Sequence, residues 1–156
     1  MKRYIGCDPG SSGALAMICE DGTIEIVPFD EEQYRNKLEE WSKDSDVVCA
    51  VEKVAAYPGQ GVISVFKFGQ NYGWILGMLY ALRIPTNLVP PQTWKKAFGL
   101  TMSKAATKAE KKQKTIDTMK RMFPSVSLKR TERSKTDDDG CADALAIAAH
   151  CRRTFQ

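Results

Sequence analysis

Four acidic residues of this 156-residue chain stand where carboxylates could do chemistry. Asp8 follows an apolar stretch and precedes Pro-Gly-Ser-Ser-Gly, and Glu52 ends the apolar run VVCAVE. Asp139 and Asp143 are four positions apart, a spacing that puts both on one face at the start of a helix. Carboxylates at the ends of buried elements are costly to desolvate and repel one another, so a bound metal ion is their natural compensation.

The donor types indicate which metal such a site would take. Oxygen ligands, without histidine or cysteine at ligand spacing, favour Mg²⁺, with Mn²⁺ as a substitute, over zinc. Two such ions can activate a water molecule and stabilise the leaving oxygen of a phosphodiester. Taken alone, each acid is more simply a helix cap or a surface charge, and Asp137 and Asp138 are typical cap residues. Only their joint occurrence predicts a metal-dependent site.

Hydrophobic periodicity predicts the elements that position these acids. The expected strands span residues 3–8, 13–19, 23–27, 47–52 and 84–89, and the expected helices span 31–42, 61–83, 93–98, 103–123 and from within 137–139 to about 152. Ser103 is the expected cap of its helix, and residues 125–136, which are polar and basic, form the least ordered segment. Three antiparallel strands followed by strands alternating with helices predict a mixed sheet with helices on its faces. In such a sheet the first and fourth strands can be neighbours, which would bring Asp8 and Glu52 together.

Charge is distributed unevenly along the chain, whose net charge is +4. Residues 19–46 carry 3 basic and 10 acidic groups, whereas residues 92–136 carry 13 basic and 3 acidic groups, so the two segments have charges of −7 and +10. The basic segment suggests a phosphate-bearing polymer as partner, although a solvated lysine-rich helix would have the same composition.

Length and composition exclude several classes of protein. The chain has the length of one domain, residues 1–156, with a single core. No apolar run of signal length follows the N-terminus, so we expect a cytoplasmic protein, and the most apolar stretch, residues 72–82, is too short to span a membrane. Five scattered cysteines without a CxxC pair predict reduced, mostly buried thiols and neither disulfides nor zinc.

Five segments in order resemble one family. The segments GCDPGSSGALAMI, VVCAVEKV, FKFGQNYG, VPPQTWKKAFG and DDDGCADALAIAAH are together similar to the RuvC-type Holliday junction resolvases of the RNase H-like fold, over nearly the whole chain. The pattern looks most like phage-encoded and plastid members. The resemblance implies an α/β fold with a mixed five-stranded sheet, three antiparallel strands and then parallel ones, and helices on both faces. It also implies a homodimeric endonuclease of the bacterial cytoplasm, of phage or prophage origin, that nicks two strands of a four-way DNA junction with Mg²⁺.

The resemblance assigns roles to individual residues. Asp8, Glu52, Asp139 and Asp143 would be catalytic and would bind two metal ions. In bacterial housekeeping members the last two acids are three apart, a spacing that falls on Gly140 here, so Asp138 is the alternative to Asp139. The residues expected to contact DNA are Tyr57, by stacking on an unpaired base, Lys95 and Lys111, near the scissile phosphate, and Lys96, Lys104, Arg133 and Lys135 in the basic segment. The lysines have an alternative interpretation as solvated helix residues.

Small and aromatic residues mark the predicted helix 61–83. Gly69, Gly73 and Gly77 recur every four residues, and each should destabilise a helix by roughly 1 kcal/mol relative to alanine. We expect another backbone to pack on them, either within one subunit or at a dimer interface, and we expect Phe66 to lie in the core.

Three other functions fit parts of the sequence. An actin-like or sugar-kinase-like ATPase also opens with a strand, an aspartate and a Gly-Ser-rich turn, but needs two domains and more chain. A non-catalytic module could bind branched DNA through the basic helices while the acids only cap elements. Another RNase H-like nuclease could cut flaps, branched DNA or RNA–DNA hybrids.

Overall fold

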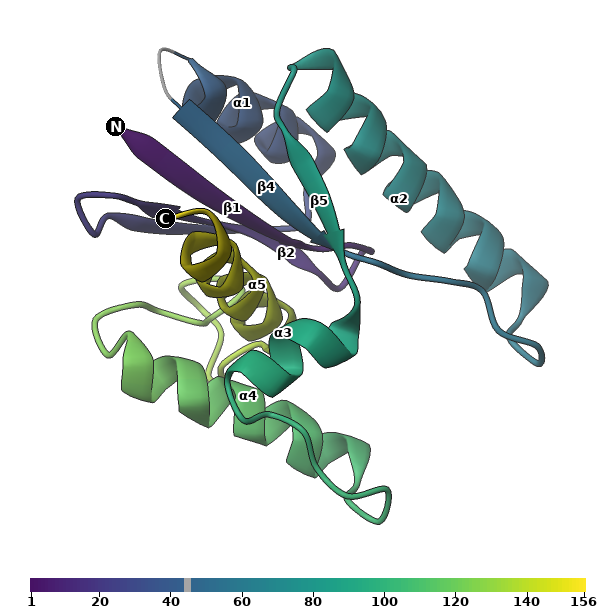
Figure 1. Cartoon of the computed structure of the whole chain (residues 1–156). Helices are drawn as coiled ribbons and strands as arrows, with labels where there is room; N and C mark the ends of the chain where they lie inside the picture. Colours follow the sequence, from purple (N-terminus) through teal and green to yellow (C-terminus); the bar gives the residue numbers. More distant parts are fainter. Residues whose placement is uncertain (44–45) are drawn as a thin grey trace.

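The structure, a computed structural model, describes residues 1–43 and 46–156 and contains one five-stranded sheet with the strand order β3-β2-β1-β4-β5 in that part of the chain (Figure 1). The elements are β1 (Lys2–Asp8), β2 (Ala14–Cys19), β3 (Ile24–Pro28), α1 (Glu31–Ser42), β4 (Asp46–Glu52), α2 (Val62–Ala81), β5 (Thr86–Val89), α3 (Pro91–Ala97), α4 (Lys108–Met122) and α5 (Asp139–Phe155).

The sheet is mixed, as predicted. β1, β2 and β3 pair antiparallel, and β4 pairs parallel with both β1 and β5. In the β1–β4 register Cys7 lies opposite Val51, so the next residues, Asp8 and Glu52, leave the same edge of the sheet. The expected neighbourhood of these two acids is therefore confirmed.

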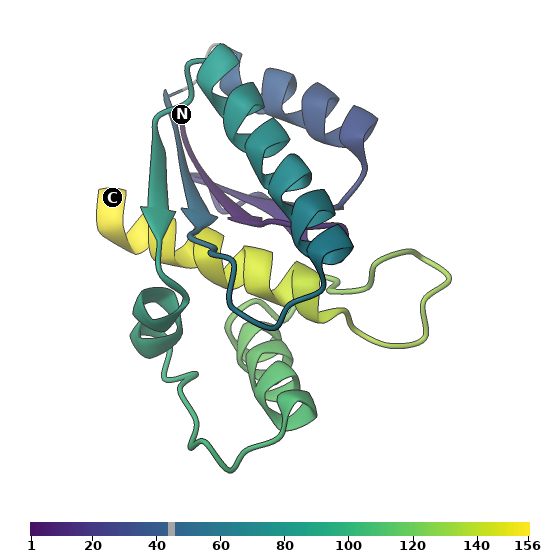
Figure 2. The same cartoon turned by 90° about the vertical axis from the view of Figure 1, so that its right-hand side faces the viewer.

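Helices cover both faces of the sheet (Figures 1 and 2). α1 and α2 pack on one face, where Ile5 and Cys7 join a core with Leu38 and Leu79. α5 lies on the other face, with α3 and α4 beyond it. There the backbones of β1 and α5 approach each other closely, since a Cβ atom on Gly6 would lie 2.1 Å from the backbone nitrogen of Ala148.

Two helices begin two or more residues away from their predicted starts. α4 begins at Lys108 and not after Ser103, because Thr107 accepts from the Glu110 amide while the Glu110 carboxylate accepts from the Thr107 amide. This reciprocal capping box fixes the helix start more firmly than a lone serine does. α3 begins at Pro91, whose fixed φ suits the first turn.

All five cysteines are free and buried, as predicted. None of the helices within residues 1–43 and 46–156 combines the length and the apolar composition that a membrane span requires.

Candidate active site: a carboxylate cleft

The four acids line one cleft of about 650 Å³. Asp8 and Glu52 reach it from the ends of β1 and β4, and Asp139 and Asp143 reach it from the first two turns of α5. The i, i+4 spacing puts both α5 carboxylates on the same helix face, toward the ends of the strands. Four residues far apart in the sequence thus share one cavity.

Four lysines line the same cleft. Lys95 comes from α3, and Lys108, Lys111 and Lys112 come from α4. The Nζ atom of Lys112 lies 2.7 Å from Oδ2 of Asp139. Lys95 and Lys111 are among the predicted contacts, whereas Lys108 and Lys112 escaped prediction, although the i, i+3 and i, i+4 spacings put all three α4 lysines on one side of that helix.

Burial makes the carboxyl groups of Asp8, Glu52 and Asp143 hard to ionise. Burial, and then the charges of Asp143, Glu52 and Asp139, raise the pKa of Asp8 well above its ordinary value. Burial raises the pKa of Asp143 to about 7, against the opposing charge of Lys95. This cluster therefore has the electrostatics of a site that a cation would stabilise.

Trp94 holds Glu52 in place. Its indole is fully buried on α3, and its Nε1 donates to Oε2 of Glu52 at 2.9 Å. Burial raises the pKa of Glu52, and this hydrogen bond opposes the rise. No local sequence pattern predicts this hydrogen bond, because an indole donor finds its acceptor through tertiary contacts.

Asp138 lies beside the cleft residues but is engaged elsewhere. Its carboxylate accepts from the amide of Cys141 at 3.0 Å and so caps α5, and it forms an ion pair with Arg130. Although burial acts in the opposite direction, the Arg130 and Cys141 hydrogen bonds lower its pKa. Asp139, and not Asp138, therefore faces the cleft.

The cleft fits a hard divalent cation in its donor chemistry, because its lining offers four carboxylates and no histidine or cysteine. The donors do not yet converge, since no three acid, histidine or cysteine side chains within residues 1–43 and 46–156 are grouped closely enough to hold a metal ion. Asp139 is paired with Lys112, so its side chain must rotate before it can share a metal ion with the other three carboxylates.

The arrangement of elements matches solved structures. Thermus thermophilus RuvC in complex with a Holliday junction substrate matches with a TM-score of 0.60 and 20% sequence identity, over 94% of this chain and 90% of that chain. A second Thermus thermophilus RuvC structure gives a TM-score of 0.58 and 20% identity, over 97% and 96% of the two chains. The fold is that of RuvC. No family model and no curated protein sequence matches this chain.

The RNase H-like fold inferred from the sequence is thereby confirmed.

Apart from Lys95 and Lys111, the residues predicted to contact DNA do not line the cleft. Lys96, Lys104, Arg133 and Lys135 are exposed and stand outside the cleft lining. Tyr57 is 68% exposed and lines a second pocket of about 490 Å³, which shares Glu52 and Pro91 with the cleft.

The exposure of Phe66 contradicts the prediction made for this residue. We expected a core residue, but its side chain is 65% exposed on the outer side of α2. The helix is apolar on more than one side, so hydrophobicity alone could not identify the face that packs on the sheet.

Proposed function

We propose that this chain is a metal-dependent endonuclease that resolves four-way DNA junctions. The observation that carries the proposal is the cleft, where four carboxylates from three segments stand beside four lysines. A fold shared with a protein solved in complex with a Holliday junction substrate supports the choice of DNA substrate.

Asp8, Glu52, Asp139 and Asp143 would hold the divalent ions, Mg²⁺ or Mn²⁺. When bound, such ions supply an activated water and stabilise charge on the leaving oxygen. Trp94 orients the Glu52 carboxylate through its hydrogen bond. Lys112 neutralises Asp139 before the ion binds and is then free to contact a phosphate, as are Lys108 and Lys111. The lysines thus bring the DNA backbone to the carboxylates.

The decisive experiment compares substrates. A synthetic four-way junction, a flap, a linear duplex and an RNA–DNA hybrid are incubated with the protein in Mg²⁺, in Mn²⁺ and in chelator. We expect paired nicks in the junction, dependent on the metal, and little cutting of the other three. Preferential cutting of flaps or hybrids would assign the chain to another kind of nuclease.

The Asp8→Asn variant tests the cleft itself. Removing one charge from the ligand set should abolish cleavage while junction affinity stays close to that of the wild type, since the lysines remain. Glu31→Gln, which removes an exposed carboxylate from α1 on the opposite face, is the matched control. Unchanged cleavage by Asp8→Asn would refute the metal-dependent mechanism, and a module that only binds DNA would show no cleavage in either protein.

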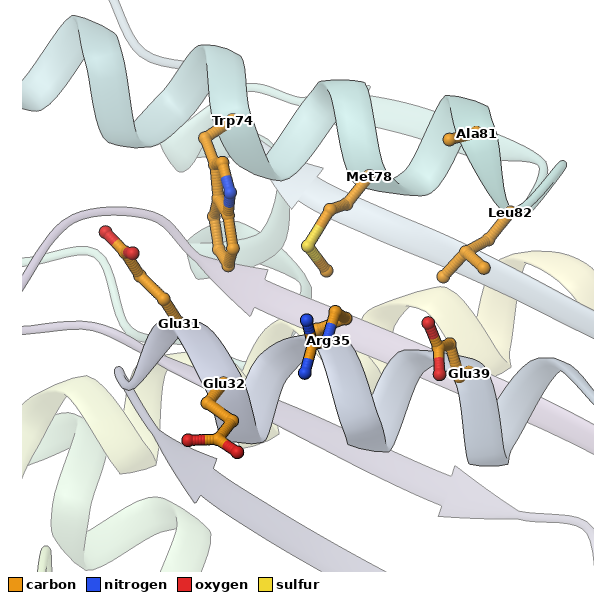
Figure 3. Close-up of a pocket in the computed structure, with 8 residues that line it drawn as sticks. All are labelled: Glu31, Glu32, Arg35, Glu39, Trp74, Met78, Ala81 and Leu82. Atoms are coloured by element: carbon orange, nitrogen blue, oxygen red, sulfur yellow. The ribbon is translucent and has the colours of Figure 1, made fainter.

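We further propose that the enzyme acts as a homodimer through α2, because two coordinated nicks need two clefts. Figure 3 shows Trp74 and Met78 of α2, and Leu82 directly after it, facing α1 across a groove. The glycine stripe lies on another side, and a Cβ atom on Gly69, Gly73 or Gly77 would meet nothing within 4 Å. Packing within the subunit therefore does not explain the stripe.

Large apolar side chains flank these glycines. Phe66 and Tyr80 are 65% and 87% exposed at the two ends of the stripe. Glycines between exposed aromatic residues allow a second helix backbone to approach closely, and the α2 helix of a second copy would satisfy both features.

A further inference from the structure

Arg130 joins the segments that carry the carboxylates. Its Nε donates to Oδ2 of Asp138 at 3.0 Å, and its Nη2 donates to Oδ1 at 3.2 Å. The same Nη2 donates to the carbonyl oxygens of Ser12 and of Gly13, the second at 3.1 Å. One guanidinium group thus links the loop between α4 and α5, the start of α5 and the turn after β1.

The acceptors are close in sequence to cleft residues. Ser12 and Gly13 belong to the turn that follows Asp8, and the Gly13 amide closes this turn on the carbonyl of Gly10 at 3.0 Å. Asp138 caps α5 and directly precedes Asp139. Arg130 therefore contacts both backbone segments that deliver carboxylates from β1 and α5.

These two segments also touch each other directly. A Cβ atom on Gly140 would lie 2.1 Å from the carbonyl oxygen of Ser12, so the first turn of α5 rests on the β1 turn without a side chain between them. The loop that bears Arg130 is fixed at its base, because Leu128 is buried and its carbonyl accepts from the Asp138 amide at 2.8 Å. A small shift of this contact would move Asp139 and Asp143 relative to Asp8.

The ion pair has the geometry of a strong one. Exposed salt bridges contribute little, but the Arg130 and Asp138 side chains are only 29% and 22% exposed and the contact is bidentate. The guanidinium supplies more donors than an ammonium group, in a fixed planar arrangement that a lysine cannot reproduce.

We propose that Arg130 is a positioning residue, which places the cleft carboxylates so that they can bind divalent cations. With Asp138 it holds the first turn of α5 against the turn after β1, and it thereby sets the spacing between Asp8 and the pair Asp139 and Asp143. Its effect on DNA cleavage rests on the proposed function, whereas its effect on cation binding does not.

The experiment titrates the wild type, Arg130→Gln and Arg130→Lys with Mn²⁺ and measures the rise in melting temperature. Both variants should need roughly 10–100-fold more Mn²⁺ for half of the effect, as is usual when a group that orients metal ligands is removed. Cleavage of a four-way junction should need correspondingly more Mg²⁺, while junction affinity in chelator stays near that of the wild type. Arg35→Gln, an exposed arginine of α1 on the other face of the sheet, is the control and should titrate like the wild type.

The outcomes separate this proposal from the nuclease proposal. Folded Arg130 variants with the wild-type Mn²⁺ midpoint would overturn the positioning role, as would a wild type that Mn²⁺ does not stabilise. If Arg130→Gln does not fold, Asp138→Asn decides, because asparagine keeps the helix cap but removes the ion pair, and its midpoint must shift in the same direction. A wild type that binds Mn²⁺ but cuts no junction would contradict the nuclease proposal. The Mn²⁺ midpoints of the wild type and the variants would still decide the role of Arg130.

Discussion

A carboxylate that folding removes from water resists ionisation, and Asp143 illustrates the consequence for stability. Burial raises its pKa to about 7 in the folded chain, whereas in the unfolded chain it ionises near 3.8. Below pH 3.8 both states hold the proton and the residue has no effect. Between pH 3.8 and about 7 only the unfolded chain releases the proton, so the free energy of unfolding falls as the pH rises, and above that range the loss stays constant.

Asp143→Asn should therefore stabilise the metal-free protein at pH 8 while having little effect at pH 4. Each unit of pKa corresponds to about 1.4 kcal/mol, and structural relaxation reduces the full value, so we expect a gain of about 2 kcal/mol. Urea unfolding in chelator at the two pH values measures it. Asp117→Asn, an exposed acid on α4, serves as control and should show no such gain. A variant that is less stable than the wild type at pH 8 would contradict the inferred electrostatics.

At the scale of the elements, local pattern predicted most boundaries well. Strands β1 and β4 follow from continuous apolar runs, and the joint placement of Asp8 and Glu52 follows from their parallel pairing. The predicted start of α4 was wrong, although the sequence T-K-A-E carries the capping-box signal for the observed start. Contacts between distant residues could not be predicted, because no local pattern reveals them.

Arg130 is an example of such contacts between residues that are distant in the sequence. Residues 125–136 were expected to be the least ordered segment, since they are polar and basic. They contain no helix or strand, yet Leu128 is buried and Arg130 bonds to residues more than one hundred positions away. The partners of the lysines in the cleft were equally hidden, as Lys112 and Asp139 show.

The α2 stripe gives a prediction for assembly. Gly73→Glu should shift the protein from dimer to monomer in analytical ultracentrifugation, because a charged side chain would block the approach of a second helix. The subunit itself should stay folded, since its own atoms leave the position open and glycine is the poorer helix former. Gln33→Glu, an exposed position on α1, controls for the added charge. A wild type that is monomeric at micromolar concentration, even with junction present, would contradict the dimer.

At the scale of the whole molecule, charge is separated between the two sides of the sheet. The acidic segment, residues 19–46, includes β3 and α1, and the basic segment, residues 92–136, forms α3, α4 and most of the loop before α5. α1 and the pair α3 and α4 lie on opposite faces (Figures 1 and 2). A polyanion therefore meets attraction on the side of the cleft and repulsion on the other.

Junction binding should consequently weaken steeply with salt, because each neutralised phosphate releases counterions. We expect the logarithm of the binding constant to fall linearly with the logarithm of salt concentration. Lys108→Gln combined with Lys111→Gln should lower the slope by roughly 2, one for each lost phosphate contact. The same pair of changes at Arg35 and Lys43, on the acidic side, should leave the slope unchanged. Affinity that is independent of salt would refute a phosphate-binding cleft.

The fold and the carboxylate cleft both depend on α5. This helix contacts β1, β2, β3 and β4 as well as α3 and α4, and it also provides two of the four cleft carboxylates. A copy that loses this helix to a protease, or that unfolds under stress, exposes one side of its sheet and breaks up the acid cluster in the same event. A copy damaged in this way would therefore lose the proposed cleavage activity together with its fold.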